Sequence, residues 1–550
     1  MAQQTANSLK SKALADLETG KLPQALKKAQ LGIKKHPKDA DYQAIAGFVL
    51  TEMKRYKQSI PHFAEASRMK PDDAQFVENL ANALMQTGQI PRALSYAEQK
   101  LERFPNNKEL VRVIDEIQLK GQNWRLIIDH TTKKLEKDPD NADLLWLRAR
   151  AYGEVGFSDH SSQDIARAYG IAPENEKIAL SKAVDLYQSG DKEGSKTILR
   201  AVLERNKFCA AALYQMSLMV DNDHAESLAR AVDTAISESD HANSVLEFAK
   251  AHLISKRDGL FSALPHFARA NAIQHNVNPY DCTQEEKRFK EISTFFPLNV
   301  PPATAGVSDG PKPIFVVGQP RSGTTLMEMM LSSAPDIAGC GELTIAGELS
   351  QKVRESGKPF DADAAAECAA EFRRLMPPLP ESSTAFVDKM PHNYQRLGFI
   401  MSAFPNARVI NMLRDPRDVG LSKWIRRFHS PGMRYASNLE SIAHSANLYR
   451  CYLSHWEKLF GDRILTVRYE DLVVDPKTCI QQVAAFCGID WDERMMTPEK
   501  NTRKVRTAST DQVRKKISTG SIGGWQEVAD QIQPMLDGLD QALWPEYRFD

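Results

Sequence analysis

Proline recurs every 34 residues through the first 173 positions of the chain, and this period constrains the fold more than any other feature. The prolines are Pro37, Pro71, Pro105, Pro139 and Pro173, in the related contexts HPKDA, KPDDA, FPNNK, DPDNA and APENE. The segments between them carry apolar residues at helical spacing, as in PQALKKAQLGIKKHP. A fixed period of this kind indicates a repeated unit that buries its apolar face against its neighbours.

Two further sets of positions share the register of the prolines. The first set holds Gly20, Gly88, Gly156 and Gly190, with Lys54 and Gln122 at the two places where glycine is absent. The second set lies five positions later and holds the small residues Ala25, Ser59, Ala93, Ser161 and Ser195. Glycine suits a tight turn between two helices because it adopts positive φ freely, and a small side chain lets the paired helices approach. The 34-residue helix–turn–helix period resembles the tetratricopeptide repeat.

The pattern changes after a segment rich in proline, glycine and small residues, NVPPATAGVSDGPKP at 299–313. Short apolar runs typical of strands follow at 313–318, 384–390, 407–413 and 463–469, with helical stretches between them. Apolar strands alternating with helices predict a parallel sheet covered on both faces. We therefore predict a multidomain chain in which an all-α tetratricopeptide array precedes an α/β, P-loop-like domain.

The predicted boundaries follow the same changes of pattern. Residues 1–209 are predicted to be tetratricopeptide repeats, 210–298 a helical cap or connector made of degenerate repeats, 299–312 a linker, and 313–550 the α/β domain. Two roles for the array stay open. It forms a concave surface that binds a peptide or partner protein, or it serves as a structural or dimerisation arm.

The overall composition of the chain argues against several classes of protein. The 71 Lys and Arg residues balance 71 Asp and Glu residues, which gives no general attraction to nucleic acid, so any anion site must be local. We expect no secretory signal and no transmembrane segment, because no apolar run is long enough. Seven scattered cysteines without a CxxC pair favour a reducing compartment, so we expect a cytoplasmic protein. No cluster of acidic residues or histidines suggests a metal.

A glycine loop follows the first predicted strand, in GQPRSGTTLMEMMLSSAP. Gly318 and Gly323 are spaced as in the P-loop GxxxxGK[ST], but Thr324 stands where the lysine belongs. A strand, a glycine loop and a helix N-terminus still direct backbone N–H groups at one anion. Without the lysine that reaches the outer phosphates of a triphosphate, the loop suits a 5′-phosphoryl anion. The predicted anion-binding residues of the loop are Arg321, Ser322, Gly323, Thr324 and Thr325.

A second anion site is predicted where the strand ARVINML ends in RDPRDVGLSKWIRRF. Arg414 lies at the carboxyl end of that strand, where open α/β sheets bind ligands, and Ser422 follows eight residues later. Two such sites suit a nucleotide with separate 5′ and 3′ charges. Here the chain resembles the sulfotransferases that use 3′-phosphoadenosine-5′-phosphosulfate (PAPS). PRSGTTL matches the family's 5′-phosphosulfate loop, Arg414 with Ser422 its 3′-phosphate pair, and YEDLV the strand whose tyrosine, here Tyr469, lies near the adenine.

Within that family the chain is similar to tyrosylprotein sulfotransferases and to bacterial sulfotransferases that carry tetratricopeptide repeats. STDQV at 509–513, followed by Arg514 and Lys515, resembles their C-terminal cofactor segment. The resemblance implies that Ser509 and Lys515 contact the nucleotide or the transferring group. It also implies that PAPS is the cofactor, that 3′-phosphoadenosine-5′-phosphate is the product, and that no metal is required.

The resemblance also assigns the catalytic residues. Lys389, in FVDKMPHNY, occupies the strand-end position of the family's lysine, which steadies the oxygen that leaves sulfur; a structural salt bridge to Asp388 is the competing interpretation. Glu342, in GCGELT, is the predicted general base, since a partly buried carboxylate can act as one. Leu343 departs from the family's acidic pair at the next position. His392 is the competing base, because histidine serves in other sulfotransferase branches.

Two other functions stay open at this point. A P-loop kinase or NTPase would need a lysine at 324 and a magnesium-binding aspartate closing an apolar strand, a place that Asp388 could imitate. A repeat scaffold with an inactive transferase domain would lose activity most readily through Leu343. The acceptor hydroxyl also stays open between a peptide tyrosine, a carbohydrate and a small alcohol.

Overall fold

The computed structural model describes residues 2–87, 89–121, 124–239, 242–306, 310–428, 430–501, 503–504, 507 and 513–549. They form two compact units, Met1–Glu136 and Lys137–Asp550. Within the described part of the chain, no helix is long and apolar enough to cross a membrane.

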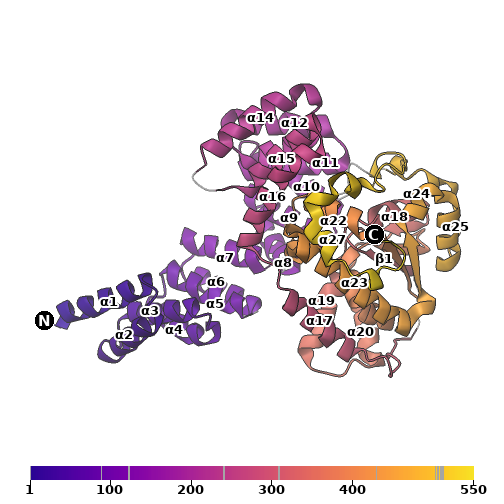
Figure 1. The fold of residues 1–550 in the computed structure, drawn as a ribbon. Helices are drawn as coiled ribbons and strands as arrows, with labels where there is room; N and C mark the ends of the chain where they lie inside the picture. The colour runs from indigo at the N-terminus through magenta and orange to yellow at the C-terminus, as the bar shows by residue number, and fades with distance from the viewer. Residues whose placement is uncertain are drawn as a thin grey trace. The chain divides into compact units, whose positions relative to one another are not determined.

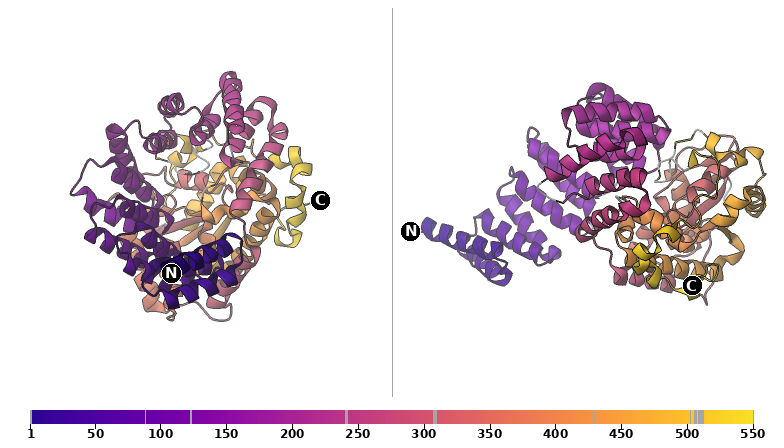
Figure 2. Two further views of the ribbon diagram at one scale, coloured as in Figure 1. Left: turned by 90° about the vertical axis from the view of Figure 1, so that its left-hand side faces the viewer. Right: turned by 45° about the horizontal axis from the view of Figure 1, so that its top comes forward.

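The first unit is a succession of antiparallel helix pairs in which each helix packs on the next (Figures 1 and 2). Asp39 and Asp73, each two residues after a repeat proline, accept a backbone N–H at the start of the following helix and cap it. Ala25 and Ser59 are fully buried where paired helices approach. The helices are α1 (Ala2–Glu18), α2 (Leu22–Lys35), α3 (Ala40–Glu52), α4 (Tyr56–Met69), α5 (Ala74–Gln86), α6 (Ile90–Arg103), α7 (Lys108–Gly121) and α8 (Trp124–Leu135).

The second unit begins with more helices of the same type. They are α9 (Ala142–Glu154), α10 (Ser158–Ile171), α11 (Glu176–Ser189), α12 (Lys192–Arg205), α13 (Ala210–Met219), α14 (Asn222–Ser237), α15 (Ser244–Asp258), α16 (Leu260–Val277) and α17 (Cys282–Phe295). Ser161 and Ser195 are buried at the predicted helix contacts.

The inter-helix turns confirm the glycine register wherever the structure describes it. Gly20, Gly156 and Gly190 have φ of 72°, 90° and 98°, and Lys54 takes the same left-handed conformation at 56° without being glycine. The positions of Gly88 and Gln122 lie outside the described residues. Position in the repeat therefore sets the turn conformation, and glycine is only the residue that adopts it at least cost.

A parallel sheet of five strands forms the core of the rest of the second unit, in the described part of the chain, with the order β2-β3-β1-β4-β5. The strands are β1 (Lys312–Gly318), β2 (Ile337–Gly339), β3 (Ala385–Asp388), β4 (Arg408–Leu413) and β5 (Ile464–Arg468). All four predicted strands are present, and β2, of three residues, is an addition at the edge. In β1, Phe315 and Val317 face one apolar core while Ile314 and Val316 face the other, as a sheet covered on both sides requires.

Helices cover both faces of this sheet (Figure 2). They are α18 (Thr324–Leu331), α19 (Ile345–Ser356), α20 (Ala362–Leu375), α21 (Leu397–Ala403), α22 (Pro416–Trp424), α23 (Leu439–Phe460), α24 (Tyr469–Val474), α25 (Pro476–Cys487) and α27 (Gln533–Gly538), with the short 3-10 helices η1 (Pro391–Arg396) and η2 (Pro431–Ser437). The central strand β1 pairs with β3 on one side and β4 on the other. The loops that leave these three strands therefore meet at one edge, where open α/β sheets bind ligands.

Candidate active site

The loop between β1 and α18 has the conformation of an anion cradle. Gly318 has φ 144°, and a Cβ there would lie 2.5 Å from the carbonyl oxygen of Met412. Gly323 has φ 99°, and a Cβ there would lie 2.6 Å from the ring of Tyr469. Neither contact is tolerable, so both positions require glycine. The N-terminus of α18 follows directly and adds its positive dipole end.

Ser322 supplies an orphaned donor to this loop. Its hydroxyl is buried and has no hydrogen-bond partner within the described part of the chain. Thr324 and Thr325 are also buried at the start of α18, and the Thr325 hydroxyl lies 3.4 Å from that of Thr507. A buried hydroxyl without a partner is costly unless a ligand completes it. Ser322, Thr324 and Thr325 thus lie together where the loop enters α18.

Arg321 lies differently from our expectation. We expected its cation inside the loop, but its φ of 79° turns the side chain toward α22, where its Nε donates to Ser422 Oγ at 2.9 Å. Arg414 Nη1 donates to the carbonyl oxygen of Arg321 at 3.1 Å. The prediction of two separate arginine pockets therefore needs correction: the two arginines meet beside Ser422, and the backbone of the loop provides the other anion position.

Several arginines gather at this place, and the Asp418 carboxylate lies 4.0 Å from Arg414 Nη2. Burial lowers the pKa of Arg321 well below its ordinary value, and the cations of Arg426 and Arg414 lower it further. Arg426, which the sequence analysis did not single out, therefore belongs to the same field. A desolvated cluster of like charges is stabilised by an anion, so the place beside Ser422 is electrostatically suited to a phosphate.

Tyr469 closes the other side of Arg414. The guanidinium lies 4.5 Å from the centroid of the Tyr469 ring, a cation–π distance, and the Tyr469 hydroxyl lies 2.8 Å from Ser521 Oγ. We expected Tyr469 in a strand, but it is the first residue of α24, directly after β5.

The C-terminal segment reaches this place through residues that the sequence did not reveal. Arg414 Nη2 donates to the Ser521 carbonyl at 2.5 Å, and the Asp418 carboxylate accepts the backbone N–H groups of Gly523 and Trp525. Of the two predicted residues in this segment, Ser509 lies outside the described residues and Lys515 is exposed.

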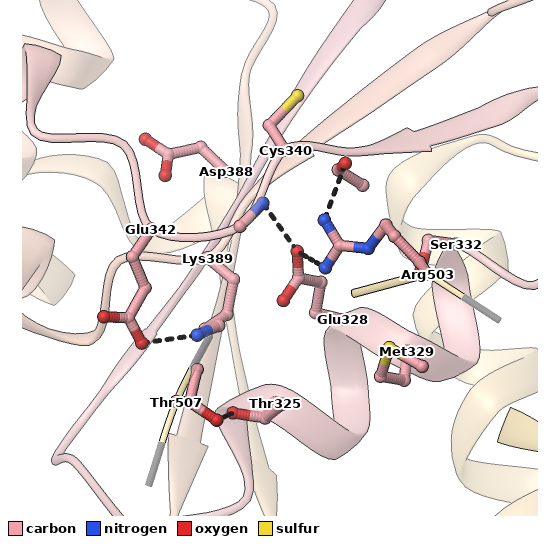
Figure 3. A network of polar contacts seen from close by, with 12 residues as sticks. Thr325, Glu328, Met329, Ser332, Cys340, Glu342, Asp388, Lys389, Arg503 and Thr507 are labelled. Atoms are coloured by element: carbon pink, nitrogen blue, oxygen red, sulfur yellow. Dashed lines mark hydrogen bonds and ion pairs between the residues drawn. The ribbon is translucent and has the colours of Figure 1, made fainter. Parts of the chain in front are cut away.

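The two predicted catalytic residues form an ion pair (Figure 3). Lys389 Nζ lies 2.5 Å from Glu342 Oε1; the lysine is fully buried at the end of β3, whereas the Glu342 side chain is 38% exposed. The competing pairing of Lys389 with Asp388 is not what the structure shows. Asp388 instead accepts the backbone N–H of Leu343 at 3.3 Å and the amide of Asn393 at 3.2 Å, and burial raises its pKa well above the ordinary value.

A second ion pair, absent from our predictions, holds the loop that carries Glu342. Glu328 in α18 is buried, accepts the backbone N–H of Gly341 at 2.8 Å and pairs with Arg503 (Figure 3). Arg503 Nη1 also donates to the Gly339 carbonyl at 2.7 Å. Glu328 therefore links the helix of the anion loop to the residue before Glu342. The pairing spans 175 positions, which no local pattern could reveal.

His392, the competing base, lies half-buried in η1 and lines the cleft beside Glu342. Burial, together with the neighbouring cations Arg396 and Lys423, lowers its pKa to about 3. Lys423 is itself buried, donates to Gln319 Oε1 at 2.7 Å, and has a pKa lowered by desolvation to about 7. It follows Ser422 on α22, so a second buried cation lies next to the predicted phosphate pair.

The described residues fit a nucleotide with two separated anionic groups. The glycine cradle with Ser322 offers donors for one anion, and Arg321, Arg414 and Ser422 offer donors for another. The Tyr469 ring lies beside these groups, where a nucleotide base could pack against it. No group of three or more metal-ligating side chains occurs among the residues that the structure describes.

The fold defines a class of architecture: a P-loop-like α/β domain preceded by tetratricopeptide-type helices. Residues 313–493 match the model of the sulfotransferase family, and residues 50–115 match a tetratricopeptide repeat model. Residues 313–493 are thus similar to the sulfotransferase family.

Several known proteins are similar to this chain. An uncharacterised protein of Aquifex aeolicus is 24% identical over 90% of this chain and 73% of its own length. Protein-tyrosine sulfotransferase 1 of Danio rerio is 27% identical over 38% of this chain and 65% of its own length, and the human protein of the same name is 27% identical over 38% and 62%. The chain thus spans less than two thirds of these two tyrosine sulfotransferases.

Among solved structures, the sulfotransferase domain of the Synechococcus PCC 7002 olefin synthase aligns with a TM-score of 0.31 and 22% identity, over 42% of this chain and 96% of that domain. A tetratricopeptide repeat protein of Parabacteroides merdae aligns with a TM-score of 0.30 and 13% identity, over 49% of this chain and 93% of its own.

Proposed function

We propose that this protein transfers a sulfuryl group from PAPS to an acceptor hydroxyl, and that the acceptor is a tyrosine in a peptide or protein. The observation that carries the proposal is the Lys389–Glu342 pair at the carboxyl end of β3, one strand away from the anion loop that follows β1. A buried cation and an accessible carboxylate at that place supply the two catalytic functions that an in-line transfer needs besides anion binding.

The donor's two phosphate positions are assigned to the two anion sites. The cradle at 318–325 holds the 5′ end through backbone N–H groups and the Ser322 hydroxyl, and the site of Arg414, Arg321 and Ser422 holds the 3′-phosphate. Tyr469 packs beside the adenine. Ser509 and Lys515 remain proposed contacts of the C-terminal segment.

When bound, PAPS supplies the sulfuryl group: an acceptor O–S bond forms as the S–O bond to its 5′-phosphate breaks, which leaves 3′-phosphoadenosine-5′-phosphate. Glu342 Oε accepts the proton of the acceptor hydroxyl. Lys389 Nζ stabilises the negative charge on the departing oxygen. The two side chains form an ion pair before the reaction. Protonation of Glu342 weakens this ion pair, so Lys389 can then interact with the departing oxygen.

A phenol is the acceptor that suits this base best. A carboxylate is a weak base, and it takes a proton more readily from a tyrosine hydroxyl, with a pKa of about 10, than from the far less acidic hydroxyl of a sugar or small alcohol. The likeness of residues in this domain to protein-tyrosine sulfotransferases supports the same acceptor.

The proposals for a protein partner and for the cellular compartment rest on the helical repeats and on the cysteines. The tetratricopeptide helices support binding of a protein partner. All seven cysteines are free thiols, which supports a location in the reducing cytoplasm.

A transfer assay with radiolabelled PAPS tests the proposal. Wild type should label a tyrosine peptide in preference to a matched serine peptide or an oligosaccharide. Glu342→Gln and Lys389→Met should each lower kcat by roughly 10²–10⁴-fold, while binding of the 3′,5′-bisphosphate stays within a few-fold. Equal residual transfer by wild type and both variants would refute the catalytic roles.

The same protein preparation distinguishes a sulfotransferase from a P-loop kinase or NTPase. The proposal expects 3′-phosphoadenosine-5′-phosphate to bind tightly in the presence of a metal chelator. Magnesium-dependent turnover of ATP, without binding of the bisphosphate, would establish a P-loop kinase or NTPase instead.

A further inference from the structure

A cleft of ≈ 790 Å³ opens beside the catalytic pair. One wall is made by the loops at 338–342 and 389–392, which carry Glu342 and Lys389, and another by the segment 377–380. A third wall is made by residues 153–154 and 156–160, the turn that joins α9 to α10 with the first residues of α10. A helix–turn–helix repeat therefore faces the residues proposed to perform the transfer.

The cleft lies on the acceptor side of the catalytic pair. Its described lining includes Pro320 and Lys389 but none of the anion-loop residues 321–325, and neither Arg414 nor Ser422. Its volume falls within the roughly 300–1,000 Å³ of ordinary ligand sites. The space next to Glu342 is therefore large enough for several residues of an acceptor chain, and among the described residues it borders the donor cradle only at Pro320.

The repeat turn fits closely against the catalytic loop. Gly156 has φ 90°, and a Cβ at that position would lie 2.7 Å from Leu343 Cδ2. Leu343 is fully buried and follows Glu342 directly. The leucine that replaces the second acidic residue of the related sulfotransferases is thus the packing partner of the repeat turn, which gives this departure a structural reason.

A second tie holds the same repeats to the transferase domain. Lys504 Nζ pairs with Asp185 in α11 and donates to Ser162 Oγ in α10 at 2.6 Å. Burial raises the pKa of Asp185, but the hydrogen bonds and charges of Lys504, Ser162 and Lys182 together lower it more, so the net pKa is lowered. Arg514 Nη2 adds a bond of 3.1 Å to the Gln188 carbonyl. With contacts at Leu343 and at Lys504, the turn is held in position before any ligand arrives.

The turn presents an aromatic surface to the cleft. Phe157 and His160 both line it, with ring centroids 5.8 Å apart, and Tyr152 supports them at 6.1 Å and 5.0 Å. Phe428 and Met433 contribute further apolar lining. Such a surface gains from contact with aromatic and apolar groups of a bound chain.

We propose that the α9–α10 turn is the acceptor-selecting wall of the active site, and that Phe157 is its main contact with the residues that flank the acceptor tyrosine. The proposal rests on the proposed function, and it assigns to this repeat a direct part in substrate choice. The neighbouring repeats remain free to bind a separate partner protein.

Steady-state transfer by the full-length protein tests the proposal with two acceptors, a tyrosine peptide of about ten residues and the small phenol N-acetyl-tyrosine amide. Phe157→Ala should raise KM for the peptide about tenfold, change KM for the small phenol less than threefold, and leave kcat and the Kd of the 3′,5′-bisphosphate within twofold. Phe157→Leu retains apolar volume, so its KM for the peptide should lie between those of wild type and Phe157→Ala. This variant keeps the test valid if the alanine variant folds poorly.

Phe261→Ala is the matched control, because Phe261 is 62% exposed on α16 and lies outside the described lining of the cleft. If both Phe157 variants match this control in KM for the peptide while wild type transfers normally, the inference fails and the proposed function stands. If KM rises equally for both acceptors and the bisphosphate Kd rises with it, the effect is general damage and the inference also fails. Absence of any transfer by wild type would overturn both proposals.

Discussion

The buried Glu328–Arg503 pair should contribute more to stability than any ion pair on the protein surface. Glu328 is 1% exposed and Arg503 29% exposed at the side chain. Removing one partner of a buried pair costs about 3–5 kcal/mol because the other charge stays buried without compensation. Since Arg503 is partly solvated, we expect Arg503→Met to cost about 3 kcal/mol, the low end of that range.

Differential scanning calorimetry of the full chain measures this cost. At roughly 2 °C per kcal/mol for a large domain, Arg503→Met should lower the melting temperature of the transferase transition by about 6 °C. Glu328→Met should cost about 2 kcal/mol, because Arg503 keeps its bond to the Gly339 carbonyl and some solvent. The double variant should be about 2 kcal/mol more stable than the sum of the two single effects, which is the interaction energy of the pair.

Arg374→Met is the matched control for this cycle. Arg374 pairs with Glu371 on the surface of α20, with side chains 67% and 32% exposed, and such pairs contribute about 0–1 kcal/mol. The reasoning is refuted if Arg503→Met shifts the transition no more than Arg374→Met does. It is refuted equally if the double variant shows the plain sum of the single effects.

Three further predictions concern individual residues. Gly323→Ala should weaken binding of the 3′,5′-bisphosphate at least tenfold in calorimetric titration, because φ of 99° and the Tyr469 ring 2.6 Å away exclude a methyl group; unchanged affinity would contradict the cradle. Lys423 has a pKa lowered to about 7 from 10.5, so between these values the unfolded chain binds one more proton and wild-type stability rises with pH by about 1.4 kcal/mol per pH unit. Lys423→Met should abolish this slope in urea unfolding at pH 7 to 10, and a persistent slope would exclude Lys423 as its source. His392→Asn should leave the pH dependence of kcat/KM unaltered from pH 5.5 to 8, because burial lowers the pKa of His392 to about 3; loss of a limb in that range would restore histidine as the base.

Local patterns predicted the parts of this molecule that local physics determines. The 34-residue period predicted the turns, and the left-handed φ of Lys54 shows that the repeat imposes this conformation even without glycine. The glycine loop after β1 was predictable because the spacing of Gly318 and Gly323 reflects backbone geometry within eight residues of chain. Lys389 and Glu342 were found through resemblance, and the structure brings them together.

Contacts over long sequence separations could not be predicted in this way. Arg503 lies 175 positions from Glu328, and Lys504 lies 319 positions from Asp185, so only the folded topology pairs them. The side-chain direction of Arg321 depends on its own unusual φ of 79°, and an arginine in the sequence does not indicate such a φ. The edge strand β2 escaped notice because three residues are too few for an apolar period to show.

The close fit of Gly156 against Leu343 affects how this enzyme can be divided or transplanted. A fragment that starts at the proline-rich segment near 299 would retain every strand, both anion positions and the Lys389–Glu342 pair. It would also expose the face of Leu343 that Gly156 covers, and leave Lys504 without Asp185. Anyone grafting this catalytic module onto another carrier should therefore cut before α9, upstream of residue 142, and treat those early helices as part of the enzyme.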